Sequence, residues 1–158
     1  MSVIPEDCGA MRLVPEAEIA GEDAEDTRLL RELPDEARAY LLGTGYWRRV
    51  ARLRFGLGVG GIFGVFLAEA EPARDDVDRE VWVIVGDLPP LYLVTDEIAT
   101  PAEALAAYIE HRRAWVSAVR ANASVAHLAP VDVEPTKEWA AALAARLDLL
   151  AAILAERD

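Results

Sequence analysis

Residues 55–68 read FGLGVGGIFGVFLA, a stretch of fourteen residues that has no charge and five glycines. It follows the basic segment WRRVARLR of residues 47–54, in a chain whose formal net charge is -12. Three structures fit such a stretch: a phosphate-binding loop, a membrane-seeking segment, and a buried strand reached through a glycine turn. Residues 61–70 alternate as a strand does, and both faces of that alternation carry apolar side chains. We therefore favour the buried strand.

A nucleotide site is the first alternative. Gly56, Gly58 and Gly61 have the GxGxxG spacing of a dinucleotide-binding turn. That chemistry requires a helix after the turn, whose N-terminal amides hold the pyrophosphate. Residues 62–67 (IFGVFL) are typical of a strand instead, and no lysine lies nearby to complete a P-loop. A weaker version stays open, in which the glycine amides and the preceding arginines bind a small anion.

A membrane segment is the second alternative. A spanning helix needs about 20 apolar residues, more than this uncharged run supplies, and its glycines weaken any helix. Residues 1–23 have neither a basic start nor an apolar core, so they do not resemble a secretory signal. We therefore expect a soluble, cytoplasmic protein without membrane contact.

The strands predict an antiparallel sheet. Three strands are expected at about residues 61–70, 79–86 and 91–95, joined by links too short for crossover helices. Such a sheet is a meander, and the fold class is α+β. Because the predicted sheet is so apolar, its second face should also be covered. The cover is either the helices expected within residues 27–55 or a second subunit, and a homodimer therefore stays open.

Helices are expected both before and after the strands in the sequence. Residues 27–43 have helical spacing, and a short helix is expected over residues 47–55 because Trp47, Val50 and Phe55 share one helical face. Two long C-terminal helices are expected to complete the packing of the sheet.

Both C-terminal helices carry start signals. Thr100-Pro101-Ala102-Glu103 combines a threonine cap, proline at the first helical position and a capping-box glutamate. Thr136 is expected to cap the last helix. The core face expected for that helix is Trp139, Leu143, Leu147, Leu150 and Leu154.

The charge is concentrated near the start of the chain. Residues 1–26 hold eight acidic residues and one arginine, and we expect them to form a mobile or loosely docked acidic arm. The remainder, residues 27–158, is expected to fold as one α+β domain. So acidic a protein repels phosphates and is not expected to bind nucleic acid, whereas a basic protein would be attracted.

Three segments resemble a bacterial family of small proteins that has no known activity. They are GLGVGGIFGVFL (56–67), VWVIVGDLPPLYLV (81–94) and TPAEAL (100–105), and the resemblance runs from about Ala37 to Leu154. Many members of that family carry a cysteine at the position that is Arg48 here, and its replacement argues against a required thiol. The resemblance implies one domain and does not imply a chemistry.

No catalytic, metal or cofactor set is visible. Cys8 is the only cysteine, the only histidines are His111 and His127, and no nucleophile, base and acid occur together. Asp87 fits an Asx turn that sets a hairpin, or else a polar group beside a pocket floored by Tyr92 and Trp82. The candidate ligand-binding residues are Arg48, Arg49, Arg52, Gly58, Gly60, Gly61, Asp87 and Tyr92.

These observations favour a non-enzymatic acidic binding protein, an adaptor or an immunity-type protein that neutralises a basic partner. The alternative is a small-ligand or anion-binding domain at the glycine-rich turn, with or without enzymatic activity.

Overall fold

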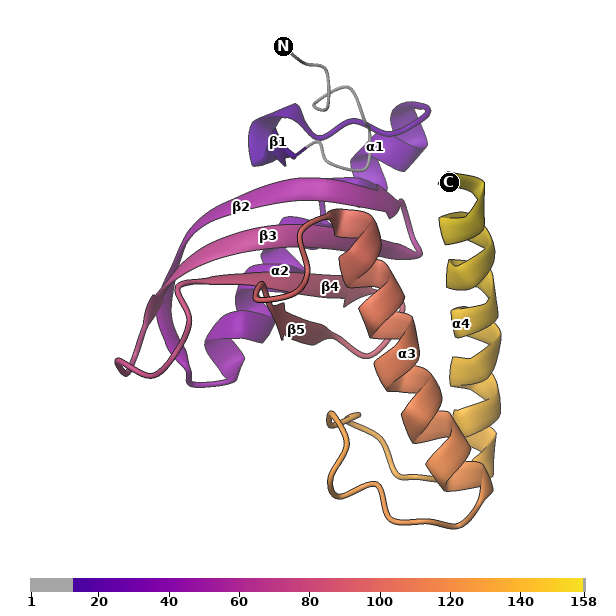
Figure 1. Cartoon of the computed structure of the whole chain (residues 1–158). Helices are drawn as coiled ribbons and strands as arrows, with labels where there is room; N and C mark the ends of the chain where they lie inside the picture. The colour runs from indigo at the N-terminus through magenta and orange to yellow at the C-terminus, as the bar shows by residue number, and fades with distance from the viewer. Residues whose placement is uncertain (1–12, 158) are drawn as a thin grey trace. The chain divides into compact units, whose positions relative to one another are not determined.

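The computed structural model describes residues 13–157, which fall into two compact units. The first ends at Ala104 and contains the sheet together with helices α1 (Ala24–Leu30) and α2 (Leu33–Gly43) (Figure 1). The second begins at Leu105 and consists of a helical hairpin, α3 and α4, with the connection between them. We refer to them as the sheet unit and the hairpin unit.

The sheet is antiparallel throughout, and its strands follow one another in chain order. The predicted α+β class and antiparallel meander are confirmed, but the sheet has five strands rather than three. The strands are β1 (Val14–Pro15), β2 (Trp47–Val59), β3 (Phe63–Pro72), β4 (Glu80–Gly86) and β5 (Leu91–Val94).

The long strand β2 replaces the short helix expected over residues 47–55, so that prediction is wrong. Its pairing with β3 shifts register between Trp47 and Arg49, between Val50 and Arg52, and again after Phe55. Each irregularity adds a residue to one strand, which breaks the alternation that normally marks a strand. The apolar residues consequently recur at a spacing that imitates a helical face.

The turn from β2 to β3 explains two of the glycines. The Ile62 N–H donates to the Val59 carbonyl at 3.0 Å, and Gly61 has a φ of +81°. The Gly60 N–H donates to Oδ1 of Asp26 at 2.6 Å. A Cβ on Gly60 would lie 2.7 Å from that same oxygen, so only glycine permits this close approach.

Helices α1 (Ala24–Leu30) and α2 (Leu33–Gly43) pack on one face of the sheet. The Asp23 carboxylate caps α1 by accepting the Asp26 N–H at 2.8 Å, and Pro34 occupies the start of α2. Between them and the sheet lies a core in which each side contributes fully buried residues. They are Leu30, Leu33, Ala37 and Leu41 from the helices, and Leu53, Phe66, Ala68, Val81, Val83 and Val85 from the strands.

The predicted acidic arm is described only from residue 13 onward. There the chain forms β1, which pairs with β2, and the short 3-10 helix η3 (Glu16–Glu18). Ile19 is fully buried in the core of the sheet unit, and its carbonyl accepts a hydrogen bond from Nε of Arg31 at 2.9 Å. The first part of the arm, including Cys8, lies outside the described residues.

Both C-terminal helices begin where the sequence predicts. In α3 (Pro101–Arg120), Oγ1 of Thr100 accepts the Glu103 N–H at 3.1 Å, while the Glu103 carboxylate accepts the Ala99 N–H at 2.7 Å. In α4 (Lys137–Arg157), Oγ1 of Thr136 accepts the Trp139 N–H at 3.2 Å. These bonds satisfy amides that a helix leaves without intrahelical partners.

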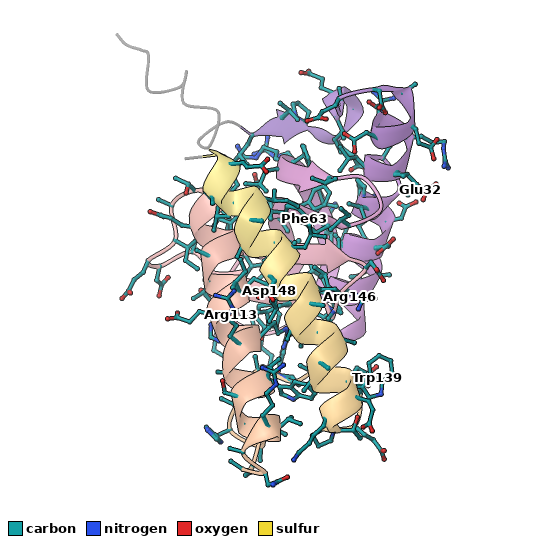
Figure 2. All side chains as sticks on the ribbon, turned by 90° about the vertical axis from the view of Figure 1, so that its right-hand side faces the viewer. Glu32, Phe63, Arg113, Trp139, Arg146 and Asp148 are labelled. Atoms are coloured by element: carbon teal, nitrogen blue, oxygen red, sulfur yellow. The ribbon has the colours of Figure 1, made fainter. Side chains whose placement is uncertain are left out.

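The hairpin unit uses arginine in two ways. Figure 2 shows Arg113 of α3 meeting Asp148 of α4, and their closest atoms are 3.4 Å apart. Arg112 is fully buried, donates to the carbonyls of Ala129 and Pro130, and lies over the ring of Tyr108. One predicted core residue of α4 is misplaced: Trp139 is 51% exposed, whereas Leu143, Leu147 and Leu150 are buried as expected.

Candidate functional site

The arginines and glycines predicted to bind a ligand lie toward opposite ends of β2. Arg48, Arg49 and Arg52 lie in its first half, whereas Gly58 is near its end and Gly60 lies in the turn beyond it. At the usual strand rise, Arg52 and Gly60 are roughly 26 Å apart along the chain. The structure therefore does not bring the arginines and the glycine turn together into one site.

The arginines of β2 mostly face carboxylates of the same sheet. Arg49 lies 3.9 Å from Glu71, and Arg52 is paired with Glu69 across the β2–β3 ladder. Arg54 approaches Glu69 at 3.6 Å and Glu80 at 3.8 Å. Arg48 is exposed. An anion on this face would have to compete with these internal ion pairs.

The glycine turn likewise holds an internal anion. Oδ1 of Asp26 accepts the Gly60 N–H, and its second oxygen, Oδ2, accepts the Glu22 N–H at 2.8 Å. The carboxylate thus joins the start of α1 to the β2–β3 turn. It occupies the position that an external phosphate or carboxylate would take at this amide.

Asp87 and Tyr92 do not form the predicted pocket floored by Tyr92 and Trp82. Tyr92 pairs with Val83, while the neighbouring Trp82 pairs with Leu93. Because successive side chains of a strand point to opposite faces, Tyr92 and Trp82 lie on different faces of the sheet. Asp87 is exposed in the β4–β5 turn, and its N–H donates to the Ile62 carbonyl at 2.9 Å.

Tyr92 belongs to a cluster of aromatic rings that the sequence did not reveal. Its ring centroid lies 5.0 Å from that of Trp47 and 6.2 Å from that of Tyr46, in both cases edge to face. Tyr46 and Trp47 are themselves 5.9 Å apart, and Tyr40 of α2 reaches Tyr92 at 6.5 Å. We call the space beside Tyr46, Trp47 and Tyr92 the aromatic hollow.

The aromatic hollow has a volume of about 300 Å³ and mixed walls. Its apolar walls are Val77, Val81 and Val94, and its charged rim is Arg74, Asp76 and Asp78. Trp47 is 4% exposed, and its Nε1 donates to the Asp78 carbonyl at 2.8 Å, so the indole is fixed. Tyr46 is 40% exposed and forms the accessible side of the hollow.

The rim of the aromatic hollow carries two carboxylates, Asp76 and Asp78, and one guanidinium, Arg74. Burial raises the pKa of the Tyr92 hydroxyl above its ordinary value, and the neighbouring Tyr46 and Asp78 raise it further. The Arg74 guanidinium lies 5.9 Å from the Tyr46 ring centroid, and its Nε is 3.2 Å from Oδ1 of Asp76. A guanidinium of this chain is therefore already held at the rim by a ring and a carboxylate.

A second feature of the sheet unit is its acidic surface on α1, α2 and the segment before them. Residues 13–43 contain nine acidic residues and three arginines. We define the acidic α1–α2 surface by its exposed members, which are Glu18, Glu22, Asp23, Glu25, Glu32, Asp35 and Glu36. Figure 2 shows Glu32 projecting at the outer side of this unit.

The arginines of this region do not neutralise it. Arg28 binds Glu25 at 2.6 Å and Glu32 at 3.1 Å, and Arg38 pairs with Glu16 and Asp35. Burial raises the pKa of the Glu36 carboxyl above its ordinary value, and the negative charge of Glu32 raises it further. The region thus keeps more carboxylates than arginines.

Residues 13–157 show neither a metal-ligand group nor a helix suited to crossing a bilayer. This part of the chain has no group of three or more histidine, cysteine or acidic side chains arranged to hold a metal ion. None of its helices combines the length and apolar composition that crossing a bilayer requires.

Comparison with protein-family models, with curated proteins and with solved structures found no match. The geometry and charge of the sheet unit therefore carry the functional argument.

Proposed function

We propose that this chain is a non-enzymatic binding protein, of the adaptor or immunity type, that recognises a basic partner. The observation that carries the proposal is the acidic α1–α2 surface, where exposed carboxylates outnumber the arginines that could neutralise them. A basic protein approaching this surface would be steered by the field and would relieve the repulsion between Glu32 and Glu36.

The distribution of charge between the units supports the same proposal. Residues 13–104 contain 19 acidic and 9 basic residues, whereas residues 105–158 contain 7 and 6. A uniform solubilising surface would spread the excess over the whole chain. Its concentration in one unit favours a directed interaction.

The anion-binding alternative has less support. An anion at the glycine turn would have to displace the Asp26 carboxylate from the Gly60 N–H, and the nearest part of β2 carries no arginine beyond Arg54. Binding at Arg49 or Arg52 would break their pairs with Glu71 and Glu69.

The test is affinity capture from a native lysate of the source cells on the immobilised protein. We expect one protein of high isoelectric point to bind near 1:1 and to be released as salt increases, because screening weakens exposed ion pairs. The variant Glu18→Gln/Glu22→Gln/Glu32→Gln/Glu36→Gln should capture much less of it.

The matched control replaces four exposed acids outside that surface, Glu97→Gln/Glu110→Gln/Glu138→Gln/Glu156→Gln, and should capture as much as the wild type. Equal loss in both quadruple variants would show that only total charge matters. Thermal stabilisation by phosphate or a nucleotide, with no protein captured, would instead favour the anion-binding alternative.

A further inference from the structure

We propose that the aromatic hollow is the anchor site for a cationic side chain, an arginine of the basic partner. The inference rests on the proposed function and deepens it, because it assigns one residue type of the partner to one place on the sheet unit. Aromatic faces combined with carboxylates bind guanidinium groups better than ammonium groups, since the planar guanidinium also stacks on rings.

The first argument is the arrangement of the rings. Trp47 is fixed by its hydrogen bond to the Asp78 carbonyl, and Tyr92 packs edge to face against it at 5.0 Å. Tyr46 closes the side that faces solvent and is half-exposed. The hollow is therefore built from rings held by the core, with only one ring on the accessible side.

The second argument is that the chain already places a guanidinium there. Arg74 lies over Tyr46 and binds Asp76. Its side chain is 65% exposed, so it covers the rim without being buried in it. An incoming arginine could make the same two contacts in place of Arg74.

The third argument links the hollow to the acidic α1–α2 surface. Glu32, Glu36 and Tyr40 are spaced four residues apart, so they lie along one face of α2. That face ends at Tyr40, which contacts Tyr92 of the hollow. A basic segment lying along α2 would meet carboxylates first and the aromatic hollow at its end.

The sign of the Arg74 effect separates a cation site from an anion site. If the hollow takes an arginine, Arg74 is both a competitor and a like charge, and its removal should strengthen binding. If the hollow takes an anion, Arg74 is a ligand, and its removal should weaken binding. An NMR spectrum of Arg74→Ala with the dispersion of the folded protein excludes unfolding as the source of such a gain.

The experiment titrates the full chain with hexa-arginine and hexa-lysine, which carry equal charge. Calorimetry gives the affinity, and the indole N–H signal of Trp47 in an NMR spectrum reports on the hollow itself. We expect hexa-arginine to bind several-fold more tightly than hexa-lysine and to shift the Trp47 signal.

Two variants with matched controls test the assignment. Tyr46→Leu should weaken hexa-arginine binding about five-fold, as expected for one exposed cation–π contact. Trp139→Leu, which removes another exposed aromatic ring in the hairpin unit, should not change the affinity. Arg74→Ala should strengthen binding about three-fold or more. Arg79→Ala removes the same charge from the same loop, outside the hollow, and should have a smaller effect.

Four results would overturn the assignment. In the first, Tyr46→Leu leaves hexa-arginine binding unchanged, while Arg74→Ala and Arg79→Ala change it equally. The proposed function would then stand without the anchor. The same holds if lysate capture succeeds but hexa-arginine leaves the Trp47 signal unmoved. Weaker binding by Arg74→Ala, or a Trp47 shift caused by inorganic phosphate, would make the hollow an anion site.

Discussion

The sheet unit carries an excess of carboxylates that the hairpin unit lacks. In the hairpin unit, Arg112 is buried against backbone carbonyls, and Arg113 joins the two helices through Asp148. In the sheet unit the arginines of β2 pair with carboxylates of the sheet, but the acids of α1 and α2 face outward and exceed their arginine partners. The two units therefore differ in how many of their acidic side chains have an arginine partner.

The units also differ in how their chains are held. The sheet depends on pairing between residues that are distant in sequence, such as Trp47 with Pro72, and on a turn clamped by Asp26. The helices of the hairpin depend on local hydrogen bonds and on caps such as Thr100 and Thr136. Substitutions at long-range contacts of the sheet and at contacts of the hairpin should therefore have different effects on stability.

The largest expected effect is at Gly86, where β4 ends. Its φ is +141°, and an added Cβ would lie 2.4 Å from the Ile62 carbonyl oxygen. Gly86→Ala should lower the free energy of unfolding by about 3 kcal/mol or more, measured by urea denaturation. Gly43→Ala, where a Cβ meets nothing within 4 Å, is the control. It should stay within about 1 kcal/mol of the wild type. Equal effects at the two glycines would contradict the close β4–β3 approach.

The next effect tests the inward use of charge in the hairpin unit. Arg112→Met removes the donor to the Ala129 and Pro130 carbonyls. It should cost about 2–3 kcal/mol, because hydrogen bonds made by a charged group contribute more than neutral ones. Arg113→Met breaks only an exposed pair and should cost less than about 1 kcal/mol. Arg112→Met alone should also speed hydrogen exchange in residues 121–136. Similar exchange in both variants would contradict the distinction between the buried Arg112 and the exposed Arg113.

A smaller effect tests the clamp on the glycine turn. Asp26→Ala removes the acceptor of the Gly60 and Glu22 amides and should cost about 2 kcal/mol, as hydrogen bonds to a charged group do. Asp35→Ala removes a carboxylate that is 91% exposed and should cost less than about 0.5 kcal/mol. If chemical denaturation gives the same midpoint for the two variants, the clamp does not stabilise the sheet unit.

The sequence predicts the parts of this fold that local chemistry determines. The Thr100 and Thr136 caps and the strands β3, β4 and β5 are marked by residues close together in the chain. The strand β2 could not be recognised, since its three register irregularities replaced alternation with helix-like spacing. The strand β1 has two residues, too few for any period. The exposure of Trp139 was missed because its spacing from Leu143 matches the buried stripe.

The aromatic hollow could be predicted only in part. Tyr92 was singled out, but its partners come from the start of β2 and from the β3–β4 loop. Those segments meet because Trp47 pairs with Pro72 and Val83 pairs with Tyr92. Without the position of β2, no sequence pattern brings Tyr46 and Trp47 to Tyr92.

The smallest effect concerns the ionisation of Glu36, whose pKa is raised first by burial and then by the negative charge of Glu32. Because the folded-state pKa of Glu36 is raised above its ordinary value of 4.5, ionisation is disfavoured in the folded protein. The resulting penalty is absent below pH 4.5 and fully present above the raised pKa. Glu36→Gln should therefore raise the melting temperature slightly at pH 7 and leave it unchanged at pH 3. A stabilisation of equal size at both pH values would contradict this origin.

The most direct test of the central claim is a residue-by-residue NMR titration of the full chain with hexa-arginine. We predict that signals of residues 18–46 and 74–94, in the sheet unit, shift and saturate together, and that this response diminishes as salt is added. Signals of residues 105–157, in the hairpin unit, should remain in place. Shifts concentrated in the hairpin unit, or spread evenly over both units, would contradict the claim that the sheet unit carries the recognition surface.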